Sequence, residues 1–255
     1  MTVLITMAGL GSRFKEKGYL PPKFRIMARG RTLMEWSLLS LRAFFGQRFI
    51  FACLDEEDGD WIRSTAAALG IAEVAVAKRS GVSRGQAETA FDALVHVDLS
   101  QPLWIYNIDT CVAPNAMRPQ DLGTAVGCVP VFHCKEPNMS FVRYGPGNDV
   151  IEIAEKRPIS SWATVGLYGF RSAACFAEHY QEAYDRGRIQ IMQGERYVAP
   201  IYELVLMQGE RIVAPRLEKD DVNILGTPAQ VLAFDPAAQP PFGNNRSPTL
   251  SHSAN

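Results

Sequence analysis

The chain opens with Val3-Leu-Ile-Thr-Met-Ala-Gly-Leu-Gly-Ser-Arg-Phe14, and the rest of the sequence is organised around this stretch. Residues 3–7 form an apolar run too short for an amphipathic helix, which predicts a buried strand. The small residues that follow suit a sharp turn where the backbone approaches a ligand: Ala8, Gly9, Leu10, Gly11 and Ser12. Consecutive backbone N–H groups in such a turn can bind phosphate oxygens. The stretch therefore predicts a strand followed by an anion-binding turn.

Two cationic side chains accompany this turn. Arg13 follows it directly, and Lys23 comes ten positions later, after a Gly18-Tyr-Leu-Pro-Pro22 segment that cannot be regular helix. The turn is only a partial dinucleotide fingerprint, because Phe14 replaces the third glycine, and it is not a P-loop, because no G-K-[ST] follows. A glycine turn after a strand is also common as plain structure. The added Arg13 and Lys23 favour a polyphosphate site.

The composition is that of an ordinary globular protein. The 255 residues are 47% hydrophobic and 21% charged with a formal net charge of -1, which suits one large α/β domain or two small ones. The near-zero charge argues against nucleic-acid binding driven by electrostatics. Five cysteines without a C-x-x-C pair indicate neither zinc nor a disulfide framework, so we expect reduced, mostly buried thiols. No segment reaches membrane-spanning length, and we expect a cytoplasmic protein.

Strands and helices alternate along the chain, which predicts one α/β domain with a mostly parallel, Rossmann-like sheet. The expected strands are 3–7, 48–54, 72–76, 102–109, 124–132, a hairpin at 141–154 and an edge strand at 212–216. The expected helices are 33–44, 61–69, 86–94, 172–184, 198–207 and 229–234, the first with a capping box at Thr32 and Glu35. Residues 236–255 lack periodicity, so we expect a domain of residues 1–235 followed by a disordered tail.

Two further places belong to the same sheet edge if the sheet is parallel. Gly85, Gln86 and Ala87 lie where a glycine-containing loop meets a helix after the third strand. Asp109 ends the central strand, where a parallel strand emerges at the ligand edge. Each of these two places also has a purely structural explanation. Residues 85–87 alone would be an ordinary helix start, and an aspartate in the position of Asp109 often caps a turn.

The N-terminal stretch resembles the sugar-nucleotidyltransferase (NDP-sugar pyrophosphorylase) superfamily, whose signature is roughly A-G-x-G-x-R-F followed by P-K. Here these residues are Ala8 to Phe14 and Pro22-Lys23. Further similar segments are Gly30–Leu33, Gly85–Ala90, Glu155–Pro158 and Thr164–Phe170, so the resemblance covers roughly residues 3–234. Arg157 is inserted before Pro158, where the family has E-K-P. The resemblance implies a nucleotidyltransferase fold of the GT-A-like kind.

The resemblance also implies a reaction in which an NTP gives its NMP to a small phosphorylated acceptor and releases pyrophosphate. Arg13 would stabilise the β- and γ-phosphates and Lys23 the α-phosphate. The nucleotide would lie against residues 8–12 and Gly85, Gln86 and Ala87. The implied acceptor residues are Glu155, Lys156, Thr164 and Gly166, although Glu155-Lys156 alone would be an ordinary solvated ion pair.

A magnesium ion is part of the implied site, because nucleotidyl transfer needs a cation to bridge phosphate oxygens. Asp109 is the implied main ligand. For the second ligand the sequence leaves Asn223 and Asp221 open, because Ile224 stands where many family members have an aspartate.

Base and acceptor identity are not readable. Within the family, the short chain without β-helix repeats most resembles the nucleotidyltransferases of surface-polysaccharide precursor synthesis, and a cytidylyltransferase is slightly favoured. One alternative is a GT-A-type glycosyltransferase, which usually has Asp-x-Asp where this chain has Asn107-Ile-Asp109. Another is a non-catalytic nucleotide-binding regulator. Pyrophosphate release separates the three. The expected partners are an NTP and a phosphorylated acceptor, without nucleic acid or membrane, and homo-oligomerisation is left open.

Overall fold

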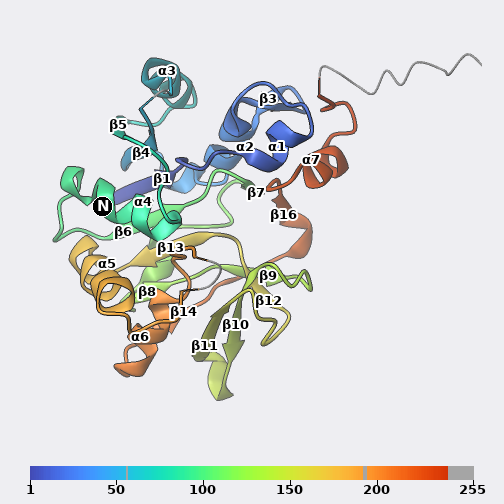
Figure 1. Ribbon diagram of the computed structural model, residues 1–255. Helices are drawn as coiled ribbons and strands as arrows, with labels where there is room; N and C mark the ends of the chain where they lie inside the picture. The colour runs from blue at the N-terminus through green and yellow to red at the C-terminus, as the bar shows by residue number, and fades with distance from the viewer. Residues whose placement is uncertain (56, 192–193, 241–255) are drawn as a thin grey trace, which may run out of the picture.

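The computed structural model describes residues 1–55, 57–191 and 194–240, and its centre is a seven-stranded sheet (Figure 1). Its strand order is β14-β8-β13-β6-β1-β4-β5. The strands, in chain order, are β1 (Thr2–Thr6), β4 (Arg48–Leu54), β5 (Glu73–Arg79), β6 (Leu103–Tyr106), β8 (Gly127–Cys128), β13 (Leu167–Phe170) and β14 (Ile212–Val213). β1 pairs in parallel with β4 and β6, and β4 with β5, whereas β13 runs antiparallel to β6 and β8. The predicted α/β class with a mixed, mostly parallel sheet is confirmed.

Helices cover both faces of this sheet, as its continuous apolar strands require. Leu4 of β1 points to the face covered by α4 (Gln86–Asp92), α5 (Ala173–Tyr180) and α6 (Ile201–Met207). Val3 and Ile5 point to the face covered by α2 (Leu33–Leu39) and α3 (Gly59–Ala68). None of the described helices is long and apolar enough to span a membrane.

A second sheet, with strand order β11-β10-β12-β9-β15, lies beside the first (Figure 1). Its strands are β9 (Val131–His133), β10 (Ser140–Tyr144), β11 (Val150–Glu155), β12 (Trp162–Thr164) and β15 (Arg216–Leu217). Residues 124–132 and 212–216 were each expected to form one strand. This expectation was wrong, because each run is divided between the two sheets. Pro130 and Pro215 lie at the divisions, where a residue without an N–H cannot continue a ladder. The two bends are adjacent, since Val131 N donates to Pro215 O at 2.9 Å.

Smaller elements gather at the carboxyl edge of β1 and β6 (Figure 1). They are α1 (Ser12–Glu16), β2 (Met27–Ala28), β3 (Arg31–Thr32), β7 (Thr110–Val112), β16 (Val222–Ile224) and α7 (Pro228–Phe234). β7 and β16 pair antiparallel. This edge is where ligands bind in open α/β sheets.

Several boundaries differ from the sequence expectation. The capping box at Thr32 is confirmed, but its helix ends at Leu39 and a separate 3₁₀ turn covers Arg42–Phe44. The central strand ends at Tyr106, so Asp109 lies in the connection to β7. All five cysteines are free thiols, and four of them are buried, as expected.

The first residues of the predicted tail pack against the rest of the protein. Ala238 is buried, and its carbonyl accepts a hydrogen bond from the Tyr19 phenol at 2.7 Å. Residues 241–255, the larger part of the predicted tail, lie outside the described residues. The division into a domain and a tail stays a prediction.

Candidate active site

The glycine turn lies at the carboxyl end of β1 and presents free amides. Gly11 adopts a left-handed conformation with φ +60°, and its carbonyl accepts hydrogen bonds from Phe14 N and Lys15 N. Among the described residues, none accepts a hydrogen bond from the backbone N–H groups of residues 8–13. Gly9, Leu10 and Ser12 are exposed, whereas Ala8 is buried. Unpaired amides in consecutive residues suit a phosphate group.

Lys23 connects this turn to Asp109. A side chain at Gly11 would bring its Cβ within 3.3 Å of Lys23 Cβ, so the absence of a side chain lets Lys23 pack against the turn. Lys23 Nζ lies 2.7 Å from Asp109 Oδ2, and both side chains are partly buried. The structure thus brings together a predicted catalytic residue and a predicted metal ligand that the sequence separates by 86 positions.

Arg13 follows the turn in α1, and its side chain is exposed. Burial and a hydrogen-bonded Glu195 carboxylate raise the pKa of Tyr197, and the Arg13 guanidinium acts in the opposite direction. The charge of Arg13 thus acts on the phenol of Tyr197, which contacts the predicted acceptor residue Lys156.

The strand register separates the two candidates for the second metal ligand. Leu225 N donates to Asp109 O, Asn223 pairs with Cys111, and Ala113 N donates to Asp221 O. Asn223 is thus two positions along the ribbon from Asp109, on the same face, and Asp221 is four. At about 3.4 Å per residue these offsets are about 7 Å and about 14 Å. The register favours Asn223.

Gln230 also lies beside Asp109, and the sequence did not single it out. An added Cβ at Gly226 would lie 3.4 Å from Asp109 Oδ2 and 3.4 Å from Gln230 Oε1, so both oxygens border the same small space. Gln230 Oε1 is buried and has no hydrogen-bond partner among the described residues, while Nε2 donates to Glu136. In the sequence, Thr227 followed by Gln230 is a helix-capping pattern. That pattern explains the backbone bond to Thr227 but gives no signal for the site.

These oxygens fit a magnesium ion. Mg²⁺ binds one or two carboxylates together with substrate phosphates and water, and amide oxygens suit the same hard cation. Asp109 supplies a carboxylate that is 31% exposed, and an orphaned amide oxygen borders the same space. Within residues 1–55, 57–191 and 194–240, no group of three or more His, Cys, Asp or Glu side chains could hold a metal without such help.

The predicted nucleotide loop is held at the carboxyl ends of β1 and β6. Gln86 Nε2 donates to Thr6 Oγ1 at 3.1 Å, and Thr6 Oγ1 donates to Tyr106 O. Ala87 N donates to Arg196 O at 2.9 Å, so this amide is already used within the protein. The backbone of Gly85 is also used, since its N–H donates to Ser83 Oγ at 3.4 Å and its carbonyl accepts from Thr89 N. Gln86 Oε1 is therefore the atom of the loop that we expect to meet a base.

The predicted acceptor residues lie in two neighbouring groups. Glu155 ends β11, is buried, and accepts a hydrogen bond from Ser140 Oγ at 2.5 Å. Thr164 Oγ1 lies 3.1 Å from the Tyr168 hydroxyl, which is 3.5 Å from Ser140 Oγ. Burial raises the pKa of Glu155 above its ordinary value, although the Ser140 hydroxyl acts against the shift.

Gly166 lies between the group around Glu155 and Thr164 and the residues near Asp109. It has φ +82°, and any side chain there would clash with the Asn107 amide. Asn107 Oδ1 is buried without a partner among the described residues, two positions before Asp109. The other group is Lys156, whose ammonium donates to the Tyr197 hydroxyl and lies 4.5 Å from the ring centroid.

Comparison with known proteins places the chain in a family. No family model and no curated protein matches the sequence. A solved nucleoside-diphosphate-sugar pyrophosphorylase from Vibrio cholerae RC9 is 32% identical, with 92% of this chain and 99% of that chain covered and a TM-score of 0.84.

Two more distant structures show the same fold. The inositol-1-phosphate CTP transferase from T. maritima is 14% identical with a TM-score of 0.70, covering 95% of this chain and 98% of that chain. A Bacillus anthracis protein provisionally named a glucose-1-phosphate thymidylyltransferase is 18% identical with a TM-score of 0.70, covering 96% and 98%. The chain belongs to the sugar-nucleotidyltransferase (NDP-sugar pyrophosphorylase) superfamily and is an enzyme of the nucleotidyltransferase class.

Proposed function

We propose that this enzyme transfers NMP from an NTP to a sugar phosphate or another small phosphorylated acceptor. The observation that carries the proposal is the contact between Lys23 and Asp109 beside the unpaired amides of residues 8–13. A cation, an acidic metal ligand and free N–H groups in one place complement a polyphosphate. The Vibrio cholerae neighbour, a nucleoside-diphosphate-sugar pyrophosphorylase by name, supports the same reaction class.

The chemistry follows from charge and position. An oxygen of the acceptor phosphate attacks the α-phosphorus of the NTP, a new P–O bond forms, and the bond between the α-phosphorus and the bridging oxygen breaks. Pyrophosphate leaves with the bond electrons. Such a transfer needs alignment and neutralisation of charge rather than a strong base. In this proposal Lys23 acts at the α-phosphate, Arg13 at the β- and γ-phosphates, and Lys156 at the acceptor.

Magnesium would be held by Asp109, with Asn223 and Gln230 as the nearest amide candidates and Asp221 farther along the ribbon. When bound, the ion would neutralise phosphate charge. The protein itself supplies the other substrate contacts. The amides of residues 8–13 bind phosphate oxygens, and Gly85 and Gln86 place the base.

The substrate and pathway are narrower proposals. We favour CTP slightly as the NTP, and surface-polysaccharide precursor synthesis as the pathway. Use of an NTP also implies action in the cytoplasm. Membership in a nucleotidyltransferase family argues against the glycosyltransferase and regulator alternatives.

Pyrophosphate release from a panel of NTPs against sugar-1-phosphates and phospho-alcohols tests this proposal. We expect release with at least one pair, strongest with CTP, and loss of release when the acceptor is omitted. Lys23→Ala is the matched inactive control. Hydrolysis of an NDP-sugar without pyrophosphate release, or nucleotide binding without turnover, would overturn it.

A further inference from the structure

The segment Glu195–Tyr197 lies between the nucleotide loop and the acceptor residues. Its backbone is bonded to the loop on both sides, since Arg196 N donates to Arg84 O at 2.6 Å and Arg196 O accepts from Ala87 N. A Cβ added at Gly85, which has φ +137°, would lie 2.5 Å from the Arg196 carbonyl oxygen. The close approach therefore depends on glycine at position 85. We call residues 195–197 the strap.

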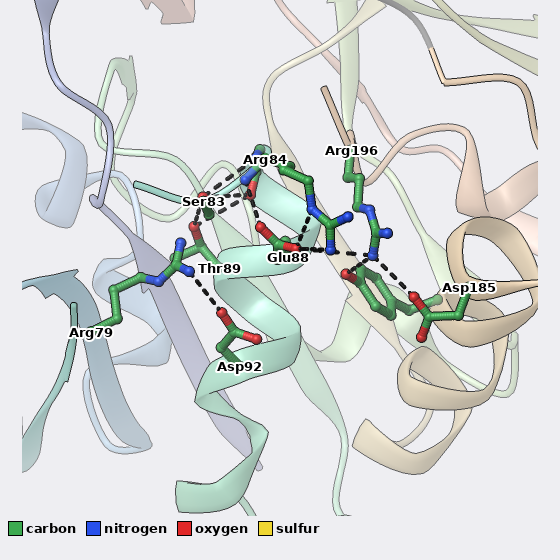
Figure 2. Close-up of polar contacts among 10 residues, drawn as sticks. Arg79, Ser83, Arg84, Glu88, Thr89, Asp92, Asp185 and Arg196 are labelled. Carbon is green, nitrogen blue, oxygen red and sulfur yellow. Dashed lines mark hydrogen bonds and ion pairs between the residues drawn. The ribbon is translucent and has the colours of Figure 1, made fainter. Parts of the chain in front are cut away.

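The buried Arg196 side chain anchors the strap to Tyr180, to Glu88 and to the exposed Asp185 (Figure 2). Arg196 is 6% exposed, and its Nη1 donates to the Tyr180 hydroxyl at 2.5 Å and to Asp185 Oδ1 at 3.1 Å. The same atom lies 4.0 Å from Glu88 Oε1. A buried guanidinium is costly unless its partners are in place, so these bonds define one position for the segment.

Glu88 ties this anchor to the loop itself. Arg84 donates to the Glu88 carboxylate from both its backbone N–H, at 2.6 Å, and its Nε, at 2.7 Å (Figure 2). Burial opposes the charge of Glu88, but the bonds from Arg84 and the Arg196 guanidinium hold its pKa below the ordinary value. Arg84, Glu88 and Arg196 thus join the loop, α4 and the strap into one unit.

Tyr197 is at the acceptor end of the strap. Its phenol oxygen accepts a hydrogen bond from Lys156 Nζ, and its ring faces the same ammonium. Its carbonyl accepts a hydrogen bond from the Tyr184 hydroxyl, which fixes the backbone. Lys156 itself has a left-handed backbone conformation with φ +51°, so its place depends on the surrounding contacts.

We propose that Tyr197 is a positioning residue that orients the Lys156 ammonium toward the acceptor phosphate, and that Arg196 sets its place relative to the nucleotide loop. This inference rests on the proposed function. The strap makes the position of the acceptor lysine depend on the same backbone that holds Gly85 and Ala87. Because the two substrates must meet in line, such a common support keeps their reacting atoms in register.

Tyr197→Phe tests the proposal, because it keeps the ring and removes only the oxygen that Lys156 contacts. We expect KM for the acceptor to rise at least ~10-fold and KM for the NTP to stay within about 2-fold, since this oxygen serves one substrate only. Tyr144→Phe is the matched control, because the Tyr144 hydroxyl at the end of β10 donates to Ala214 O, between β14 and β15. Arg196→Lys should raise both KM values, because its anchor supports the loop as well as Tyr197.

A second measurement does not depend on turnover. The rate at which an N-hydroxysuccinimide ester acetylates Lys156 at pH 8, followed by mass spectrometry, should rise at least ~3-fold in Tyr197→Phe and stay unchanged in Tyr144→Phe. Unchanged acceptor KM in an active Tyr197→Phe enzyme, or an unchanged acetylation rate, would overturn the inference. If the wild-type enzyme releases no pyrophosphate with any substrate pair, the proposed function fails, and the acetylation rate still decides whether Tyr197 holds Lys156.

Discussion

Lys23 Nζ lies 2.7 Å from Asp109 Oδ2, and this ion pair joins the N-terminal glycine turn to the end of the central strand. Neither side chain is fully exposed, and both lie where parallel strands of the sheet end. The pair therefore brings the predicted phosphate-binding cation and the predicted metal ligand into one site.

Asp109→Asn should lower pyrophosphate release by at least ~10², because it keeps the size of the side chain and removes the charge that Mg²⁺ requires. Mn²⁺ binding, followed by electron paramagnetic resonance, should weaken in parallel. Gln230→Ala and Asn223→Ala should each raise the Mg²⁺ concentration needed for half-maximal activity. Asp221→Asn is the control and should resemble the wild type, given its place level with Ala113. If Asp221→Asn alone weakens Mn²⁺ binding, the register argument is wrong.

Lys23→Ala and Arg13→Ala should each lower kcat by ~10² or more, because each removes charge that complements the transition state. Folding should be little affected, since partly exposed ion pairs contribute about 1 kcal/mol or less. Steady-state kinetics and thermal melting check the two expectations together. Lys15→Ala removes an exposed cation from the same short helix and should leave kcat unchanged. Full activity of the Lys23→Ala variant would show that Lys23 is not part of the catalytic site.

Glu155 should make the protein less stable as pH rises above about 4.5, its ordinary pKa. Burial raises the pKa of this carboxyl in the folded state, so the folded protein holds the proton to a higher pH than the unfolded chain does. The free energy of unfolding then falls between the two pKa values. Urea titrations at several pH values should show a smaller fall in Glu155→Gln.

Ser140→Ala should change the pH dependence of the free energy of unfolding in the direction opposite to Glu155→Gln. The Ser140 hydroxyl donates to Glu155 and lowers its pKa, so losing it should extend the fall in stability to higher pH. An identical pH dependence in the wild type and Glu155→Gln would show that another group is responsible.

Two truncations should differ in stability. Removing residues 241–255 should leave the melting temperature unchanged, because their sequence lacks the apolar periodicity of a packed segment. Removing residues 236–255 also deletes buried Ala238 and its hydrogen bond with Tyr19. A lost hydrogen bond of this kind costs about 1 kcal/mol, or roughly 2–4 °C for a chain of this size. Equal melting temperatures for both truncations would show that the Tyr19 contact contributes nothing.

Local features of the molecule could be predicted from the sequence because their causes are local. The strand at 48–54 follows from its own apolar residues, and the capping box follows from Thr32 and Glu35, three positions apart. The glycine turn after β1 follows from small residues at the end of a buried run. The superfamily signature of residues 8–14 and 22–23 then indicated the enzyme class that the Vibrio cholerae neighbour supports.

Other features depend on where distant segments meet, and neither propensity nor spacing encodes that meeting directly. Pro130 and Pro215 divide two apolar runs between sheets because their neighbours pair in different ladders. By sequence, Gln230 is an ordinary helix-capping residue. It joins the site only because the pairing of β16 with β7 brings α7 beside Asp109. Arg196 reaches the loop at Gly85 only because the fold returns the strap over α4. Local residues thus determine the strands, caps and turn. Contacts between segments far apart in the sequence, such as the 86 positions between Lys23 and Asp109, determine which oxygens and cations share the site.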